Sequence, residues 1–89
     1  MSTISLCMIV KNEELNIARC LDSVAELVEE VIIVDTGSID RTVEIVSNYT
    51  SQVYSYRWKD DFSDARNYSF SKASMDYCMW MDADDVLEE

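Results

Sequence analysis

The segment with the clearest chemical potential is the run of carboxylates within residues 82–85, directly after five bulky apolar residues at 77–81. Residues two apart in an extended segment point the same way, so Asp82 and Asp84 can face one cation together. Carboxylate oxygens suit hard ions such as Mg²⁺ or Mn²⁺, and Mg²⁺ sites often add substrate phosphates. The pattern fits a metal-diphosphate site and a solvated acidic turn about equally well, because short acidic clusters are common.

A second polar stretch, at residues 35–40, holds the only glycine of the sequence. Asp35 follows an apolar run, where a carboxylate can accept hydrogen bonds from a ribose or a base edge. It can equally close a turn onto Gly37 or Ser38. Gly37 indicates a turn with positive φ more than a phosphate loop, because no G-x-G-x-x-G or Walker pattern surrounds it.

Two basic residues are candidate ligand contacts. Arg66 can pair with a phosphate or stack on a base. The alternative, which composition favours, is a salt bridge to Asp60, Asp61 or Asp64. Lys11 can contact a phosphate, although surface lysines usually contribute little. The aromatic residues Trp58 and Phe62 are interpreted as packing residues.

Secondary structure must position these residues, and the apolar pattern predicts four strands and three helices. The predicted strands are 4–10, 31–34, 53–56 and 77–81, the last of them buried, and the predicted helices run from about 16 to 28, 40 to 49 and 64 to 73. The expected N-caps are Asn12 or Asn16 for the first helix, Ser38 or Asp40 for the second, and Ser63 or Asp64 for the third. The third helix is expected to present a small inner face from Ala65, Ser69, Phe70 and Ala73.

The order β-α-β-α-β-α-β predicts an α/β fold, a three-layer sandwich around a mainly parallel four-stranded, Rossmann-like sheet. Right-handed crossovers place the carboxyl ends of all strands at one edge of such a sheet. Four loops are therefore expected to converge there: 11–13, 35–38, 58–61 and 82–85.

Bulk composition narrows the function. With 89 residues, 48% of them hydrophobic, residues 1–89 fit a single folded domain. A net charge of −11 argues against nucleic acid or an anionic membrane as partner, and any phosphate ligand would need a cation beside it. The absence of histidine excludes a Cys/His zinc site, and three cysteines without paired spacing suggest reduced thiols in a cytoplasmic protein. Neither a signal peptide nor a membrane span is expected.

Four segments together resemble the amino-terminal half of family 2 glycosyltransferases: 4–14 (ISLCMIVKNEE), 31–42 (VIIVDTGSIDRT), 61–67 (DFSDARN) and 79–85 (MWMDADD). The resemblance covers nearly the whole chain and keeps the order of the motifs. It implies the GT-A fold, a nucleotide-diphosphate sugar donor such as a UDP-sugar, a divalent metal (Mn²⁺ or Mg²⁺) and inverting transfer to an acceptor.

The resemblance also implies roles for individual residues. Asp82 and Asp84 match the D-x-D motif, the first near the ribose and the second at the metal on the diphosphate, with both as metal ligands and Ala83 beside the donor. Asp35 matches the acid that contacts the base, in one loop with Gly37 and Ser38. Arg66 matches an arginine near the donor. The first-strand loop that lines the nucleotide corresponds to Ile9, Val10, Lys11 and Glu13.

Two departures from the family pattern matter. Thr36 stands where many members carry a second aspartate, which puts a contact through that position in doubt. The sequence 35–38 (DTGS) looks like the subset that modifies lipopolysaccharide cores or peptides.

The family's catalytic base lies well beyond the D-x-D motif, so the resemblance implies no catalytic residue within residues 1–89 and an amino-terminal GT-A part that binds without turnover. The full protein would add an acceptor glycan, lipid-linked sugar or peptide, and a location at the inner face of the membrane. Self-association through an exposed sheet edge is a further expectation.

Other classes of protein remain alternatives. A nucleotidyltransferase also binds a diphosphate through a metal ion, but it usually has a Gly-rich basic loop after the first strand, which residues 11–14 do not form. A receiver-like signalling domain would need a phosphorylatable Asp after the third strand, where Arg57 and Trp58 stand. A non-catalytic interaction module with an acidic surface stays open.

Overall fold

A computed structural model describes residues 3–58 and 61–81 of the chain. The elements in order are β1 (Ile4–Val10), α1 (Ile17–Val24), the 3₁₀ helix η1 (Ala25–Leu27), β2 (Glu30–Asp35), α2 (Thr42–Val46), β3 (Val53–Ser55), α3 (Phe62–Ser71) and β4 (Tyr77–Trp80). Among these described residues, no helix is both long and apolar enough to cross a membrane. The predicted alternation of strands and helices is confirmed.

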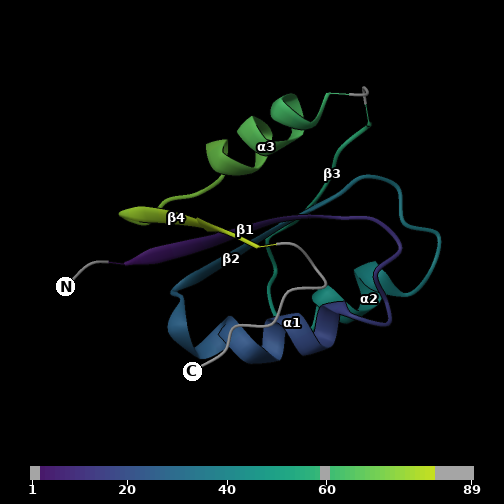
Figure 1. Ribbon diagram of the computed structural model, residues 1–89, viewed down its shortest axis with the longest axis horizontal. Coiled ribbons are helices and arrows are strands. Elements are labelled where there is room, and N and C mark those ends of the chain that lie inside the picture. The colour runs from purple at the N-terminus through teal and green to yellow at the C-terminus, as the bar shows by residue number, and fades with distance from the viewer. Residues whose placement is uncertain (1–2, 59–60, 82–89) are drawn as a thin grey trace.

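The four strands form one sheet in the order β3-β2-β1-β4, and every neighbouring pair is parallel. Helices α1 and α2 cover one face of this sheet, and α3 covers the other (Figure 1). The predicted three-layer α/β sandwich is therefore confirmed. From β1 the chain adds β2 and β3 on one side of the sheet and then β4 on the other side of β1. Ligands of open α/β sheets bind beyond the carboxyl ends of the strands where the strand order changes in this way.

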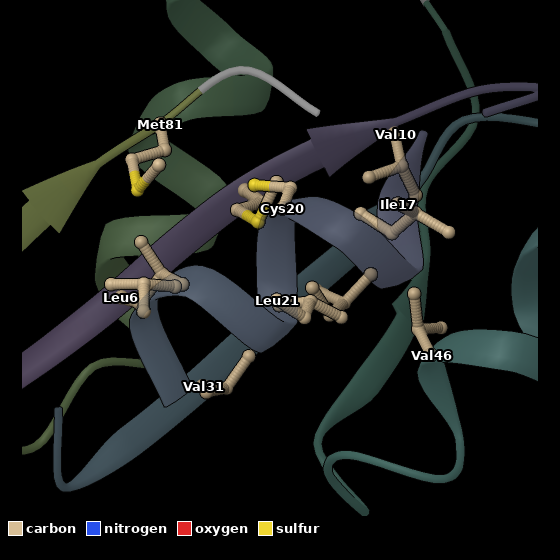
Figure 2. Packing of buried hydrophobic residues seen from close by; sticks show 11 residues of the cluster. Leu6, Val10, Ile17, Cys20, Leu21, Val31, Val46 and Met81 are labelled. Atoms are coloured by element: carbon tan, nitrogen blue, oxygen red, sulfur yellow. The ribbon is translucent and has the colours of Figure 1, made fainter. Parts of the chain in front are cut away.

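The larger core lies between the sheet and α1. Leu6 and Val10 of β1 pack against Ile17 and Leu21 of α1 in one buried cluster (Figure 2). Each of these side chains is at most 1% exposed, and full burial of one stabilises the fold by about 1.5–3 kcal/mol. This packing holds the amphipathic helix on the sheet and fixes where the loop before it begins.

Small side chains let α3 approach the other face closely. Ala65 and Ser69 are fully buried, as the predicted inner face required, and the Cys7 thiol of β1 donates to the Ser69 carbonyl at 3.8 Å. Burial, followed by the neighbouring Cys78 thiol, raises the pKa of Cys7 to about 12. Cys7 is therefore an inert packing residue at neutral pH.

Several predicted details are wrong. The strand β4 is not buried: it is an edge strand, with Tyr77 61% exposed and Cys78 exposed as well. An apolar run has the same composition at an edge as at the centre of a sheet, so the pattern could not distinguish the two. The first helix ends at Val24 and continues only as η1, which leaves Leu27 about half exposed.

The predicted helix caps are confirmed only in part. Helix α3 begins two residues earlier than predicted, because the Asp61 carboxylate accepts the Asp64 N–H at 3.1 Å. Asn16 stands at the N-cap of α1 without a side-chain capping bond. Arg41 occupies that position before α2, where the preceding Asp40 carboxylate accepts the Thr42 N–H at 2.9 Å.

Candidate functional site

A cavity of about 400 Å³ opens at the carboxyl ends of β2 and β3. It is lined by Asp35, Thr36, Gly37, Ser55, Tyr56, Arg57 and Trp58. Its volume lies in the range of about 300–1,000 Å³ that small-molecule sites occupy. β2 and β3 are adjacent and parallel, so the segments that follow them enclose the cavity from two sides.

Asp35 ends β2 and organises the turn beneath this cavity. One of its carboxylate oxygens accepts the N–H groups of Gly37 and Ser38, both at 3.1 Å, and the other accepts the Ser38 hydroxyl. The φ angle of Gly37 is +116°, a conformation that suits glycine. The turn interpretation of Asp35 is thus confirmed. These three bonds leave about one acceptor position of the carboxylate for a ligand.

The loop after β1 is joined to the loop after β2 by reciprocal hydrogen bonds. Asn12 donates its backbone N–H to the Ser38 hydroxyl at 2.9 Å, and its side-chain oxygen accepts the Ile39 N–H at 2.8 Å. The φ angle of Asn12 is +53°, which asparagine tolerates better than most residues. Glu13 and Glu14 add backbone bonds to the Thr42 hydroxyl and the Asp40 carboxylate. Four hydrogen bonds therefore hold the two loops together.

The four residues predicted to line the nucleotide at the end of β1 and in the loop after it differ in exposure. Val10 is 1% exposed and belongs to the core, so it offers a ligand no side chain. Its carbonyl instead accepts the N–H and the hydroxyl of Thr36 at 3.0 and 3.3 Å. Ile9 is partly buried, whereas Lys11 is exposed and Glu13 is partly exposed on the joined loops.

Arg66 lies on α3 and is not among the residues that line the cavity. Its guanidinium carbon is 5.0 Å from the ring centroid of Trp80, the last residue of β4. The expected alternative for Arg66 was a salt bridge, and this ring contact was not anticipated. The structure thus brings Asp35, Gly37 and Ser38 together and places Arg66 beside β4.

The predicted metal ligands Asp82 and Asp84, and Ala83 between them, lie outside the described residues. Within residues 3–58 and 61–81, no three acidic, cysteine or histidine side chains gather in a way that could hold a metal ion. The described part of the chain ends at Met81, which is 6% exposed and belongs to the core cluster.

Four cavity residues were missed from the sequence: Ser55, Tyr56, Arg57 and Trp58. Trp58 was expected to be a packing residue, but it is 40% exposed and lines the cavity. No motif marks these positions, and the available signal was their place at the end of a predicted strand (Ser55 and Tyr56) or directly after it (Arg57 and Trp58). Arg57 gives the cavity lining a cation, which matters in a chain of net charge −11.

The family model of Glycosyl transferase family 2 matches residues 5–89 of the chain. A TPR repeat-containing protein of Synechococcus elongatus is 44% identical over 87 residues, which cover 98% of this chain and 22% of that protein. The SPbeta prophage-derived glycosyltransferase SunS of Bacillus subtilis is 37% identical over 89 residues, covering 98% of this chain and 21% of SunS. The chain thus spans about a fifth of the length of these two relatives.

Solved structures agree with this match. Glucosyl-3-phosphoglycerate synthase from Mycobacterium tuberculosis, in complex with UDP, superposes with a TM-score of 0.80 and 27% identity over 96% of this chain and 35% of its own. Its complex with Mn²⁺ and UDP-glucose gives a TM-score of 0.78 and 28% identity over 93% of this chain and 33% of its own.

Proposed function

The chain belongs to glycosyl transferase family 2, and we propose that it binds the nucleotide diphosphate of a sugar donor at the carboxyl edge of its sheet. The expected GT-A fold is confirmed by the superposition on glucosyl-3-phosphoglycerate synthase. The observation that carries the proposal is the cavity of about 400 Å³ lined by Asp35, Gly37 and Trp58. It lies at the sheet edge where α/β folds bind nucleotides.

The cavity has the parts that a nucleoside needs. Asp35 supplies a fixed acceptor for a base N–H or a ribose hydroxyl, because the turn bonds hold its carboxylate in place. Trp58 adds a partly exposed aromatic surface, and Arg57 adds a cation. UDP is the donor nucleotide that we propose, and the UDP complex of the superposed synthase supports this choice.

A divalent ion fits the residues that follow β4, because Asp82 and Asp84 contribute only hard oxygen donors. We propose that these two carboxylates hold Mn²⁺ or Mg²⁺, and the synthase complex with Mn²⁺ and UDP-glucose supports the choice of metal. When bound, the ion would offset the charge of the diphosphate and stabilise the departing nucleotide. The chain's own part is to hold the nucleotide and orient the sugar toward an acceptor.

The transfer reaction is a proposal for the whole protein. We propose inverting transfer to a glycan, lipid-linked sugar or peptide, with the catalytic base outside these 89 residues. Within this region the proposed activity is donor binding without turnover. A cytoplasmic location, with the whole protein at the inner face of the membrane, belongs to the same proposal, and Cys7 and Cys78 as free thiols support the cytoplasmic part.

The exposed edge strand also supports the proposal that separate copies of this chain associate. β4 pairs with β1 on one side only among the described strands, and its Tyr77 and Cys78 are exposed. Unpaired strand edges offer backbone groups to another chain. Sedimentation velocity should show a concentration-dependent dimer, and a strictly monomeric chain at about 1 mM would rule this out.

The donor site is tested by titrating the chain with UDP, with and without Mg²⁺, while amide shifts are followed by NMR. Metal-dependent shifts in residues 10–13, 35–38 and 55–58 are expected. Asp84→Ala should remove the metal dependence and leave the other amide shifts of the folded chain intact. Glu26→Ala, which removes an exposed carboxylate on η1, is the matched control and should behave as the parent chain. No response at millimolar UDP with metal would leave the acidic interaction module as the better interpretation.

A further inference from the structure

The contact between Arg66 and Trp80 joins α3 to the end of β4. The guanidinium carbon of Arg66 lies 5.0 Å from the centroid of the indole ring, within the range of a cation–π interaction. Arg66 is exposed, whereas Trp80 is partly buried. A long, flexible cationic side chain is thus held against a less mobile aromatic surface.

The indole itself is fixed from two directions. Trp80 is the last residue of β4 and is in register with Cys7 of the central strand β1. The ring of Phe70 meets the indole edge-on, with centroids 6.1 Å apart and an interplanar angle of 78°. The aromatic surface beneath Arg66 is therefore held by both the sheet and α3.

This arrangement suits recognition of a phosphate. Stacking engages the flat face of a guanidinium, whereas its N–H donors lie in the plane and can bind phosphate oxygens in pairs. Ordering the side chain before binding lowers the entropic cost of binding. The contact also lies at the carboxyl end of β4, on the same edge of the sheet as the cavity beside Asp35. A chain of net charge −11 needs cations held at that edge to accept a diphosphate.

We propose that Trp80 is a positioning residue that holds the Arg66 guanidinium for the diphosphate of the donor. The proposal rests on the proposed function, because it requires that a nucleotide diphosphate binds at this edge. It gives a role to Trp80, two positions before Asp82, for which the family resemblance implied none.

A similar contact at the other end of α3 provides a control. The Lys72 ammonium lies 5.1 Å from the ring centroids of both Tyr54 and Tyr68. Lys72 stands at the C-cap of α3, away from the carboxyl edge of the sheet. Lys72→Met therefore removes one positive charge and both cation–π contacts, at a residue that does not line the cavity.

The test is a double-mutant cycle with Trp80→Leu, Arg66→Met and the combined variant, measured by calorimetric titration with UDP and with uridine in the presence of Mg²⁺. Arg66→Met should weaken UDP binding about tenfold and leave uridine binding unchanged, because uridine has no phosphate. Trp80→Leu should weaken UDP binding about three- to tenfold when Arg66 is present, and have no effect in the Arg66→Met background. Trp80→Phe should restore most of the affinity, and Lys72→Met should bind UDP as the parent chain does.

Equal losses for Trp80→Leu in both backgrounds, or an equal loss for uridine, would assign Trp80 a purely structural role and overturn the proposal. An unchanged UDP affinity in Trp80→Leu would do the same. If the parent chain binds no UDP with metal, the proposed function fails together with this inference, whereas binding without coupling overturns the inference alone.

A second measurement covers the case in which Trp80→Leu does not fold. The indole N–H resonance of Trp80 should shift on addition of UDP in the parent chain, and should shift much less with uridine or in Arg66→Met. A resonance that responds equally to UDP and uridine would overturn the proposal.

Discussion

The two ends of strand β2 carry carboxylates that work in different ways. Glu30, at the amino end, accepts hydrogen bonds from three segments far apart in the sequence, through Ser5, Gln52 and Ser74. Among the described residues, the Asp35 carboxylate, at the carboxyl end, accepts hydrogen bonds only from the turn that directly follows it. One carboxylate ties the fold together, and the other shapes a local turn beneath a cavity.

This difference indicates that Glu30 contributes mainly to the stability of the fold and Asp35 to ligand binding. Burial opposes the charge of Glu30, but the hydrogen bonds from Gln52, Ser5 and Ser74 outweigh it and lower the pKa to about 2. Asp35 keeps an acceptor position beside open space. The Glu30 carboxylate is thus bonded to internal partners from three segments, whereas the Asp35 carboxylate retains capacity for a ligand.

The largest expected effect is on stability, from Glu30→Ala. This change removes the acceptor of four hydrogen bonds, from the Ser5 hydroxyl, the Gln52 amide, and the backbone and hydroxyl of Ser74. The free energy of unfolding should fall by about 2–3 kcal/mol, measured by urea denaturation. UDP affinity of the folded fraction should not change. A tenfold loss of UDP affinity with an unchanged free energy of unfolding would contradict the assignment of Glu30 to stability and Asp35 to binding.

A pH titration isolates the charge of the same residue. The pKa of Glu30 is lowered from 4.5 to about 2 in the folded chain, so its contribution is present above pH 4.5 and is lost as the pH falls toward 2. Glu30→Gln should lose less stability than the parent chain in that window, by about 1–2 kcal/mol after allowance for solvent screening. Asp40, whose pKa is also lowered, remains in both proteins. Parallel stability curves from pH 5 to pH 2 would contradict the assignment.

The opposite result is expected from Asp35→Ala. Loss of the turn bonds to Gly37 and Ser38 should weaken UDP binding about tenfold, about 1.4 kcal/mol, with a smaller loss of unfolding free energy. Asp35→Asn is the matched variant, because it keeps the shape and one oxygen acceptor. It should fall between the parent chain and Asp35→Ala in a calorimetric titration. Equal UDP affinity in all three proteins would remove Asp35 from the site.

The smallest effect is expected at Asn12, which joins the two loops. Asn12→Gly keeps the backbone at its φ of +53° but loses the acceptor of the Ile39 N–H, whereas Asn12→Ala also adds strain. Asn12→Ala should cost about 1 kcal/mol and Asn12→Gly about half of that. Hydrogen exchange of the Ile39 amide should be faster in both variants. Unchanged exchange would show that this bond does not hold the loops together.

Most of the fold could be predicted because each element carries its own periodic signal. The apolar runs at 4–10 and 31–34 and the helical pattern beginning near Ile17 depend only on local sequence, and these elements formed close to the expected boundaries. The edge position of β4 could not be predicted, because pairing depends on contacts between segments distant in the chain. The start of α3 at Phe62 was missed because Asp61, Ser63 and Asp64 are all suitable caps, and only the backbone geometry selects among them.

In the candidate site, too, some features follow from the sequence and others only from the tertiary structure. The sequence by itself determined the family, the parallel α/β order and the presence of Asp35 and Gly37 in one turn, because these follow from residue type and short-range spacing. The tertiary structure alone decided that Trp58 lines a cavity, that Val10 belongs to the core and that the Arg66 guanidinium lies over the ring of Trp80. Such contacts join residues that are not neighbours in the chain, and only the packing of helices against a sheet brings them together.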